Sequence, residues 1–101
     1  MSSKTLEELT TLMHDFVRSK GWYEKDSKRQ QTPRNLSISL ALEAAEILEH
    51  FQWDEEFSKE ELAEELADVA LYLLQLASIS EIDLEKAILD KLKVNANRNW
   101  D

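Results

Sequence analysis

The chain has 101 residues, a length that favours a single domain over residues 1–101. It contains one Gly, one Pro and no Cys, and so few turn residues exclude a strand-rich barrel or sandwich. The lack of cysteine also excludes disulfides, thiolate zinc sites and thiol nucleophiles. The 21 Asp and Glu against 12 Lys and Arg give a net charge of −9, which argues against binding to nucleic acid or anionic membranes.

The first predicted helix covers about residues 4–20, and Gly21 follows it as a stop signal. Its apolar residues recur at helical spacing, namely Leu6, Leu9, Met13, Phe16 and Val17. Residues 21–32 are polar, partly basic and without periodicity, which indicates a loop. A loop of this length is a candidate for a functional role rather than a simple connection.

Three further helices are predicted, over about residues 33–52, 59–80 and 83–98. Thr32 and Pro33 are typical of a cap and a first helical residue. Residues 58–61 (SKEE) have the form of a capping box, and Asp83 can cap the last helix. Short connections between these helices predict antiparallel neighbours, and hence an all-α, four-helix bundle-like subunit.

The sequence shows no sign of a membrane or secreted protein. The start lacks a positive segment followed by an apolar one, so we expect no secretory signal. The longest apolar stretch, residues 66–79, is too short to cross a bilayer and contains Asp68. We therefore expect a soluble, cytoplasmic protein.

Projection onto helices sorts the acidic residues into two groups. One stripe of the helix at 33–52 contains Ser39, Glu43, Glu46 and His50. One stripe of the helix at 59–80 contains Glu61, Glu65, Asp68 and Tyr72. Apolar residues flank both stripes. The helix at 59–80 is apolar nearly all round, so we expect that helix to be buried. Four carboxylates, Glu43, Glu46, Glu65 and Asp68, are then predicted to face one groove between the helices.

Four carboxylates in one groove raise one another's pKa values unless a cation neutralises them. Mg²⁺ suits such oxygen ligands and leaves positions open for water and phosphates, with Mn²⁺ as a substitute. Zinc fits poorly, because His14 and His50 are the chain's imidazoles and it has no thiol. Neither histidine completes the Glu-x-x-His motif of di-iron bundles. The alternative is that these carboxylates are ordinary solvated surface charge.

The last predicted helix carries Lys91, Asn95 and Arg98 within one sector. The two cations suit the phosphate oxygens of a metal-bound polyphosphate, or they favour the helix dipole without any ligand. Aromatic residues present a similar choice. Trp22 and Trp53 either pack against other side chains or stack on a base. For Phe51 and Phe57, near the turn between the second and third predicted helices, packing is the favoured interpretation.

Three motifs occur in order between about Gln31 and Arg98: QTPRNLSISLALEAAEILEHFQW, EELADVALYLLQLA and DLEKAILDKLKVNANR. Together they resemble the MazG-like nucleoside triphosphate pyrophosphohydrolases, above all the dCTP pyrophosphatase-like branch of that all-α superfamily. The resemblance implies hydrolysis of a (deoxy)nucleoside triphosphate to the monophosphate and pyrophosphate. It also implies a homodimer or homotetramer with sites built partly between subunits.

The resemblance assigns a role to most of the candidate residues. The Mg²⁺ ligands it implies are Glu43, Glu46, Glu65 and Asp68. The implied residues of the nucleoside pocket are Trp53, Tyr72 and Asn95, and Trp22 joins them as a candidate from the loop. The implied stabilisers of phosphate charge are Lys91 and Arg98. One carboxylate also accepts a proton from water, and Glu46 is the candidate, although the sequence does not choose among the four.

This chain departs from the family pattern at three points. Leu42 stands where the full MazG signature has another glutamate, and Gln31 or Thr32 replaces a histidine expected just before the proline. The loop before Pro33 is also longer. Two alternatives remain at this stage: a non-catalytic acidic helical interaction module, or a related pyrophosphohydrolase acting on dUTP or phosphoribosyl-ATP.

Overall fold

The computed structural model describes residues 3–99, and its regular structure is entirely helical. Its four helices are α1 (Leu6–Ser19), α2 (Pro33–Glu49), α3 (Lys59–Ile79) and α4 (Leu84–Ala96). No strand occurs over residues 3–99. The all-α prediction is confirmed, and each helix lies within three residues of its predicted bounds. Among these helices, none is long and apolar enough to cross a membrane.

Side-chain caps fix where the helices begin, as the sequence predicted. The Thr32 hydroxyl accepts a hydrogen bond from the Asn35 N–H at 3.2 Å, and Pro33 is the first residue of α2. Asp83 accepts from the Lys86 N–H at 3.1 Å at the start of α4. These bonds satisfy N–H groups that have no partner within the helix.

The capping box at Ser58 is present in part. Its hydroxyl accepts from the Glu61 N–H at 3.3 Å. A complete box occurs instead at α1, where Thr5 and Glu8 exchange two hydrogen bonds of 3.0 Å. Gly21 ends the turn after α1 with φ of 74°, a conformation that glycine adopts without strain, so the predicted stop is confirmed.

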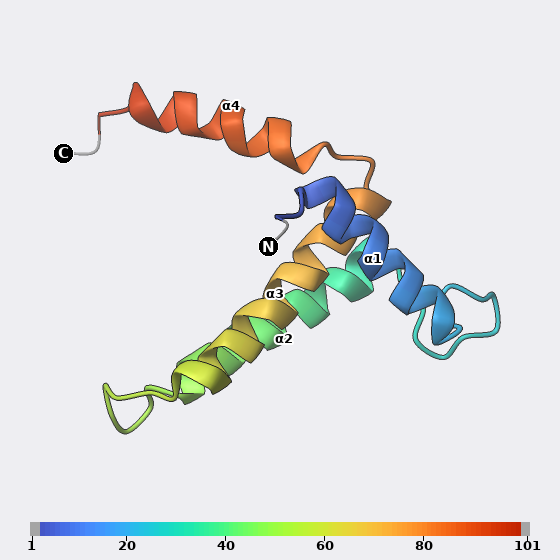
Figure 1. The fold of residues 1–101 in the computed structure, drawn as a ribbon, viewed down its shortest axis with the longest axis horizontal. Coiled ribbons are helices and arrows are strands. Elements are labelled where there is room, and N and C mark those ends of the chain that lie inside the picture. Colours follow the sequence, from blue (N-terminus) through green and yellow to red (C-terminus); the bar gives the residue numbers. More distant parts are fainter. Residues whose placement is uncertain (1–2, 100–101) are drawn as a thin grey trace.

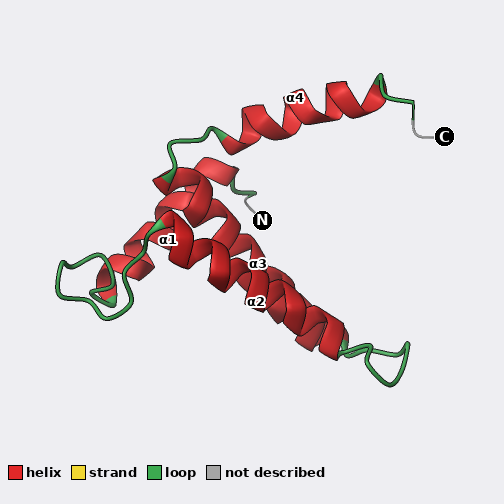
Figure 2. Ribbon diagram, turned by 180° about the vertical axis from the view of Figure 1, so that it is seen from behind, coloured by secondary structure: helices red, strands yellow, loops and turns green. Residues whose placement is uncertain are grey.

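Three of the helices pack together, and the fourth does not. Helices α2 and α3 run antiparallel along each other, and α1 packs across α3 (Figure 1). Helix α4 leaves the end of α3, makes few contacts with the other helices and projects away from them (Figures 1 and 2). The predicted bundle-like packing therefore holds for α1 to α3. It is corrected for α4, which does not fold back as an antiparallel neighbour.

The core of the single chain is small. Its buried apolar residues are Met13, Val17, Leu36, Leu74 and Ala77. The radius of gyration is 16.1 Å, whereas a compact domain of this length has about 13 Å. Helix α3 is not buried all round as predicted, because Leu66 is 51% exposed and Leu71 is 43% exposed. Many large apolar side chains thus remain on the surface of one chain.

Candidate active site

Helices α2 and α3 bring three of the four predicted carboxylates into contact. Glu43 and Glu46 lie one turn apart on α2, and Glu65 meets them from α3. One ligand oxygen from each of the three lies within 4.8 Å of the others. The antiparallel pairing of two acidic stripes, each with apolar flanks, produces this cluster, which is hereafter the carboxylate cluster.

The carboxylate cluster has the properties of a cation site. Glu43 and Glu65 are half-buried, and Glu46 is exposed. The Oε2 atoms of Glu43 and Glu65 are buried and have no hydrogen-bond partner among the residues that the structure describes. Leaving such oxygens without a partner is costly, and a hard divalent cation with oxygen ligands removes that cost. The donor set therefore fits a hard divalent cation.

The surroundings of the cluster raise the pKa values of two of its carboxyl groups. Burial raises the pKa of Glu43, and the neighbouring charges of Glu46 and Asp68 raise it further. The pKa of Glu65 is raised by hydrogen bonding to the Glu46 carboxyl group, by burial and by the charges of Glu46 and Glu43, while His50 opposes the shift. The folded chain thus holds these carboxylates in an environment that disfavours their ionised form.

His50 lies at the edge of the carboxylate cluster. Its Nδ1 is 4.0 Å from Glu61 Oε2, and its Nε2 is 3.9 Å from Glu65 Oε1. The imidazole side chain is 14% exposed, so the surrounding protein holds it in place. The predicted stripe therefore ends at His50, the C-cap of α2, which lies beside the acidic stripe of α3.

A pocket of about 630 Å³ opens between α1, the 20–32 loop, α2 and α3. It contains Asp68, the fourth predicted carboxylate, together with Ser39 from the polar stripe of α2. Trp22 and Tyr72 also line it. The remaining walls come largely from apolar residues of the core helices, including Met13, Val17, Leu36 and Leu71. This main pocket combines apolar walls with a few polar groups, as small-molecule sites do.

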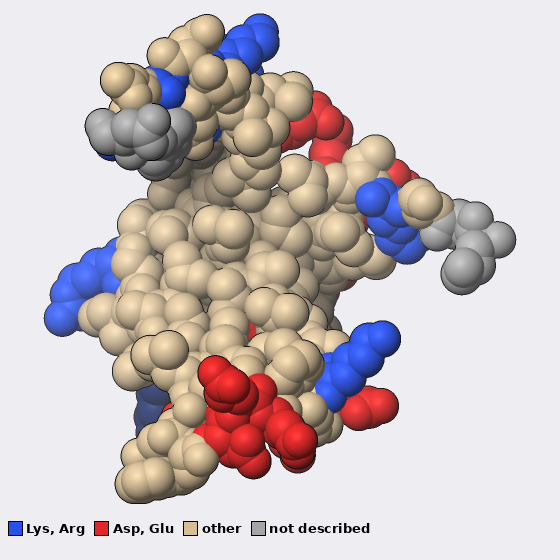
Figure 3. Space-filling model, turned by 90° about the vertical axis from the view of Figure 1, so that its left-hand side faces the viewer, with Lys and Arg blue, Asp and Glu red and all other residues tan. Residues whose placement is uncertain are grey.

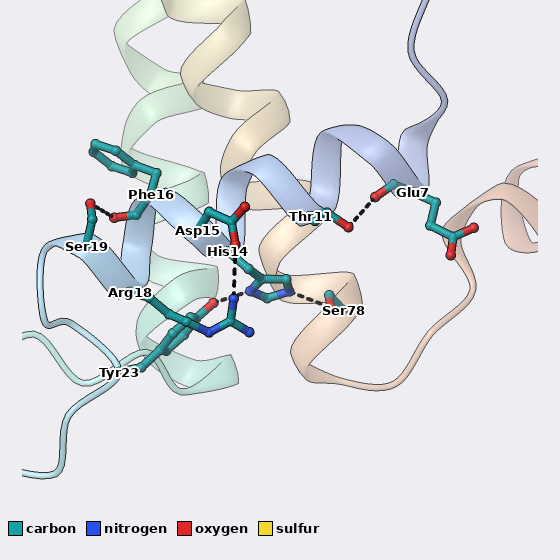
Figure 4. Close-up of polar contacts among 9 residues, drawn as sticks. All are labelled: Glu7, Thr11, His14, Asp15, Phe16, Arg18, Ser19, Tyr23 and Ser78. Carbon is teal, nitrogen blue, oxygen red and sulfur yellow. Dashed lines mark hydrogen bonds and ion pairs between the residues drawn. The ribbon is translucent and has the colours of Figure 1, made fainter.

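A polar network holds the 20–32 loop against α1 and α3. The Gln75 side chain, which is 3% exposed, donates to Gln31 Oε1 at 2.8 Å and to the Tyr23 hydroxyl at 3.3 Å. The Tyr23 oxygen lies 2.5 Å from His14 Nδ1, and His14 Nε2 lies 2.7 Å from the Ser78 hydroxyl, contacts drawn in Figure 4. Burial and the nearby charge of Arg18 lower the pKa of His14, which favours a neutral ring.

The structure does not bring the predicted residues of α4 to the carboxylate cluster within one chain. Lys91, Asn95 and Arg98 do not line the main pocket, because α4 projects away from α2 and α3 (Figure 1). Helical spacing predicted one face for these residues, but α4 ends at Ala96 and Arg98 lies beyond it. The spacing also does not determine the direction in which the helix leaves α3.

Trp53 also lies apart from the main pocket. It sits in the connection between α2 and α3 and is 90% exposed. Its neighbours Phe51 and Phe57 pack together with ring centroids 5.5 Å apart, so the packing interpretation of these two residues is confirmed. Trp22, by contrast, packs edge-on against Phe16 at 5.8 Å and borders the main pocket.

Sequence reasoning assigned no pocket role to six polar residues that line the main pocket: Lys28, Arg29, Gln30, Gln31, Asn35 and Gln75. The length and basic character of the 20–32 loop were the available signal for the two cations. Gln75 is a single polar residue on an apolar stretch of α3, which indicates a buried hydrogen bond but not its partner.

Comparison with known proteins finds relatives of this chain by sequence. A family model described as MazG-like matches residues 38–100. The chain is 36% identical over 107 aligned positions to dCTP pyrophosphatase 1 from Bos taurus, covering 96% of this chain and 60% of that protein. It is 35% identical to dCTP pyrophosphatase 1 from Homo sapiens, covering 93% of this chain and 58% of that protein. The chain thus spans under two thirds of these relatives.

One solved structure has a fold similar to that of this chain over the chain's whole length. The chain superposes on a pyrophosphatase from Archaeoglobus fulgidus with a TM-score of 0.76 and 32% sequence identity. The superposition covers 100% of this chain and 97% of that one. The likeness therefore extends to all four helices, including α4.

Proposed function

The chain belongs to the MazG-like family, as its motifs predicted, and on that premise we propose that it is a nucleotide pyrophosphohydrolase. The reaction converts a (deoxy)nucleoside triphosphate and water to the monophosphate and pyrophosphate. The observation that carries the proposal is the carboxylate cluster, in which three carboxylate oxygens lie within 4.8 Å of one another. Asp68 continues this acidic surface into the main pocket.

The residues that hold Mg²⁺ in this proposal are Glu43, Glu46, Glu65 and Asp68. Their oxygens are the ligands that the ion prefers, and two of them are buried without another partner among the described residues. When bound, Mg²⁺ supplies positive charge that acidifies the attacking water, polarises the phosphoryl group and stabilises the leaving pyrophosphate.

Glu46 is the proposed general base. It is the exposed member of the carboxylate cluster, so water reaches it directly. Its carboxylate accepts one proton as the water oxygen bonds to phosphorus. The anhydride bond between the α and β phosphates breaks in the same step. The electrons of that bond leave with the pyrophosphate, so the attacked atom is the α phosphorus, and the water oxygen is retained in the monophosphate.

The main pocket is the proposed site of the nucleoside. Tyr72 offers an aromatic face to a base, Trp22 borders the same pocket with Arg29 over its ring, and the apolar walls exclude water from it. The polar end of the pocket, with Ser39 and Asp68, would then face the phosphates. This orientation places the anhydride bond next to the carboxylate cluster.

A second copy of the chain supplies the remaining residues in this proposal. Lys91 and Asn95 of α4, and Arg98 just after it, lie away from the carboxylate cluster of their own chain, and Trp53 is 90% exposed. A homodimer or homotetramer would cover the apolar face of α4 and place these residues at a neighbouring site. The cations would stabilise charge on the phosphates there.

Product analysis tests the proposed function. The purified chain is incubated in Mg²⁺ with each common NTP and dNTP, with dUTP and with phosphoribosyl-ATP, and the products are separated by anion-exchange chromatography. We expect equal amounts of monophosphate and pyrophosphate from at least one nucleotide. Release of orthophosphate and a diphosphate would contradict the proposed cleavage. Turnover of dUTP or phosphoribosyl-ATP alone would identify the related activity instead.

A further inference from the structure

The segment around the long loop concentrates positive charge in an otherwise acidic protein. Residues 18–34 carry six of the twelve Lys and Arg but only two of the 21 Asp and Glu. These cations are Arg18, Lys20, Lys25, Lys28, Arg29 and Arg34. A triphosphate is itself strongly anionic, so a chain with a net charge of −9 repels it unless cations lie near its site.

Two of the six cations line the main pocket, namely Lys28 and Arg29. The Arg29 guanidinium lies over the Trp22 ring, 5.6 Å from its centroid, and this contact keeps the side chain at the pocket. Neither cation forms an ion pair with a carboxylate among residues 3–99. Their charge is therefore available to an anion that enters the pocket.

The loop that carries these cations has a fixed position. The buried Gln75 side chain bonds both Gln31 and Tyr23, which tie the loop to α3. Gln30 adds further hydrogen bonds within the loop, among them one of 2.6 Å to the Ser27 carbonyl. A wall that is already ordered loses less conformational entropy when a ligand binds.

We infer that Lys28 and Arg29 form a phosphate-binding arm that contacts the phosphate oxygens of the nucleotide from the same chain. Asp68 lines the same pocket, so the phosphates would lie between the carboxylates and this arm. Arginine binds two phosphate oxygens with its fork, and lysine adds a point charge. The inference rests on the proposed function, and it assigns phosphate contacts to the loop in addition to those proposed for α4.

Matched charge removals on one loop test this inference. Lys28→Gln and Arg29→Gln each remove one positive charge from the pocket, and Lys25→Gln removes the same charge from an exposed position that does not line it. We expect each pocket variant to raise KM for the hydrolysed nucleotide roughly tenfold, as the loss of a charged hydrogen bond predicts. The kcat should stay within about twofold, and Lys25→Gln should change KM by less than about twofold.

Two results of these kinetics would overturn the inference. One is an unchanged KM in both pocket variants, whose fold is checked by circular dichroism. The other is an equal rise in KM for Lys25→Gln, because long-range attraction by the whole loop would then explain the effect. Arg29→Lys should recover part of the affinity lost in Arg29→Gln, since it restores the charge but not the fork.

Binding of inorganic tripolyphosphate with Mg²⁺, measured by calorimetry, separates this inference from the proposed function because it needs no turnover. We expect affinity to fall roughly tenfold in each pocket variant and to persist in Lys25→Gln. A wild type that binds tripolyphosphate through Lys28 and Arg29 without cleaving nucleotides would support the arm and overturn the function. A wild type that cleaves nucleotides, together with pocket variants that bind tripolyphosphate normally, would support the function and overturn the arm. Absence of both binding and cleavage would contradict both.

Discussion

Glu43 and Glu65 are held half-buried beside a third carboxylate, and their environment raises the pKa values of both. In isolation such an arrangement destabilises the fold, because repulsion between like charges opposes folding. A bound cation reverses the sign of the effect. The proposed metal site thus predicts that these carboxylates couple stability to metal, and this coupling can be measured one residue at a time.

Glu43→Gln should separate activity from stability. The amide keeps the side-chain volume but removes one negative charge from the carboxylate cluster. We expect the pyrophosphohydrolase rate to fall by roughly a hundredfold or more, because the metal contributes several kcal/mol to such reactions. Without divalent cations, the free energy of unfolding should stay the same or rise. The exposed Glu64 on α3 provides the control, and Glu64→Gln should change neither quantity. A variant with full activity would show that Glu43 does not serve the reaction.

Stability should fall with rising pH when no metal is present. Between the ordinary Glu pKa of 4.5 and the raised values of Glu43 and Glu65, the folded chain binds more protons at these residues than the unfolded chain. The contribution of both residues to the free energy of unfolding therefore declines through this window. Denaturant titrations from acidic to neutral pH measure this contribution. It is the difference in the free energy of unfolding between wild type and the Glu43→Gln/Glu65→Gln double variant. Saturating Mg²⁺ should abolish the decline, and an unchanged slope with Mg²⁺ would contradict the account.

Single residues differ in how well the sequence predicts them. The carboxylate cluster followed from helical spacing, because two acidic stripes with apolar flanks can face each other only across a groove. Gln75 could not be placed in the same way. Its partners, Gln31 and Tyr23, are 44 and 52 residues away, and hydrogen bonds over such separations leave no periodic signal.

Helix α3 and the 20–32 loop act together, since α3 supplies both the acidic stripe and the anchor of the loop. Gln75→Leu should release the loop, because it removes both hydrogen bonds while keeping the side chain apolar and of similar size. We expect a loss of about 1–3 kcal/mol in the free energy of unfolding and a changed Trp22 fluorescence. Gln52→Leu, at an exposed position, should stay within about 0.5 kcal/mol of the wild type. Identical fluorescence and stability in both variants would show that Gln75 does not hold the loop.

Element boundaries were well predicted because their signals are local. Thr32, Ser58 and Asp83 each satisfy backbone groups within three residues, so the caps can be found without knowledge of the fold. The course of α4 is set differently. Few contacts connect it to the rest of its chain, so nothing local in residues 84–96 determines its direction.

The molecule as a whole exposes more apolar surface than its size requires. On α4 the side chains of Leu89 and Leu92 are 54% and 59% exposed, and on α2 that of Leu48 is 71% exposed. The face in Figure 3 shows a group of acidic side chains in its lower part, below a wide area with few charged side chains. Exposed apolar surface of this extent is typical of an interface between subunits.

Sedimentation equilibrium tests whether a second copy covers this surface. The wild type should sediment with at least twice the 11.8 kDa mass of one chain. Leu89→Lys should shift the equilibrium toward the monomer, because burying an unpaired charge in an interface is costly. Lys93→Gln, a polar exchange at an exposed position on the same helix, should have a smaller effect. A wild type that remains monomeric at high concentration would contradict the proposed assembly.

The most direct test of the central claim is the Mg²⁺-dependent release of pyrophosphate from a nucleoside triphosphate by wild type and Asp68→Asn. This exchange removes a charge at constant volume from a residue that borders both the carboxylate cluster and the main pocket. We predict that wild type releases one pyrophosphate for each monophosphate, only when Mg²⁺ is present. The folded variant should be slower by roughly two orders of magnitude or more. A wild-type rate in Asp68→Asn, or cleavage that persists in EDTA, would contradict the account.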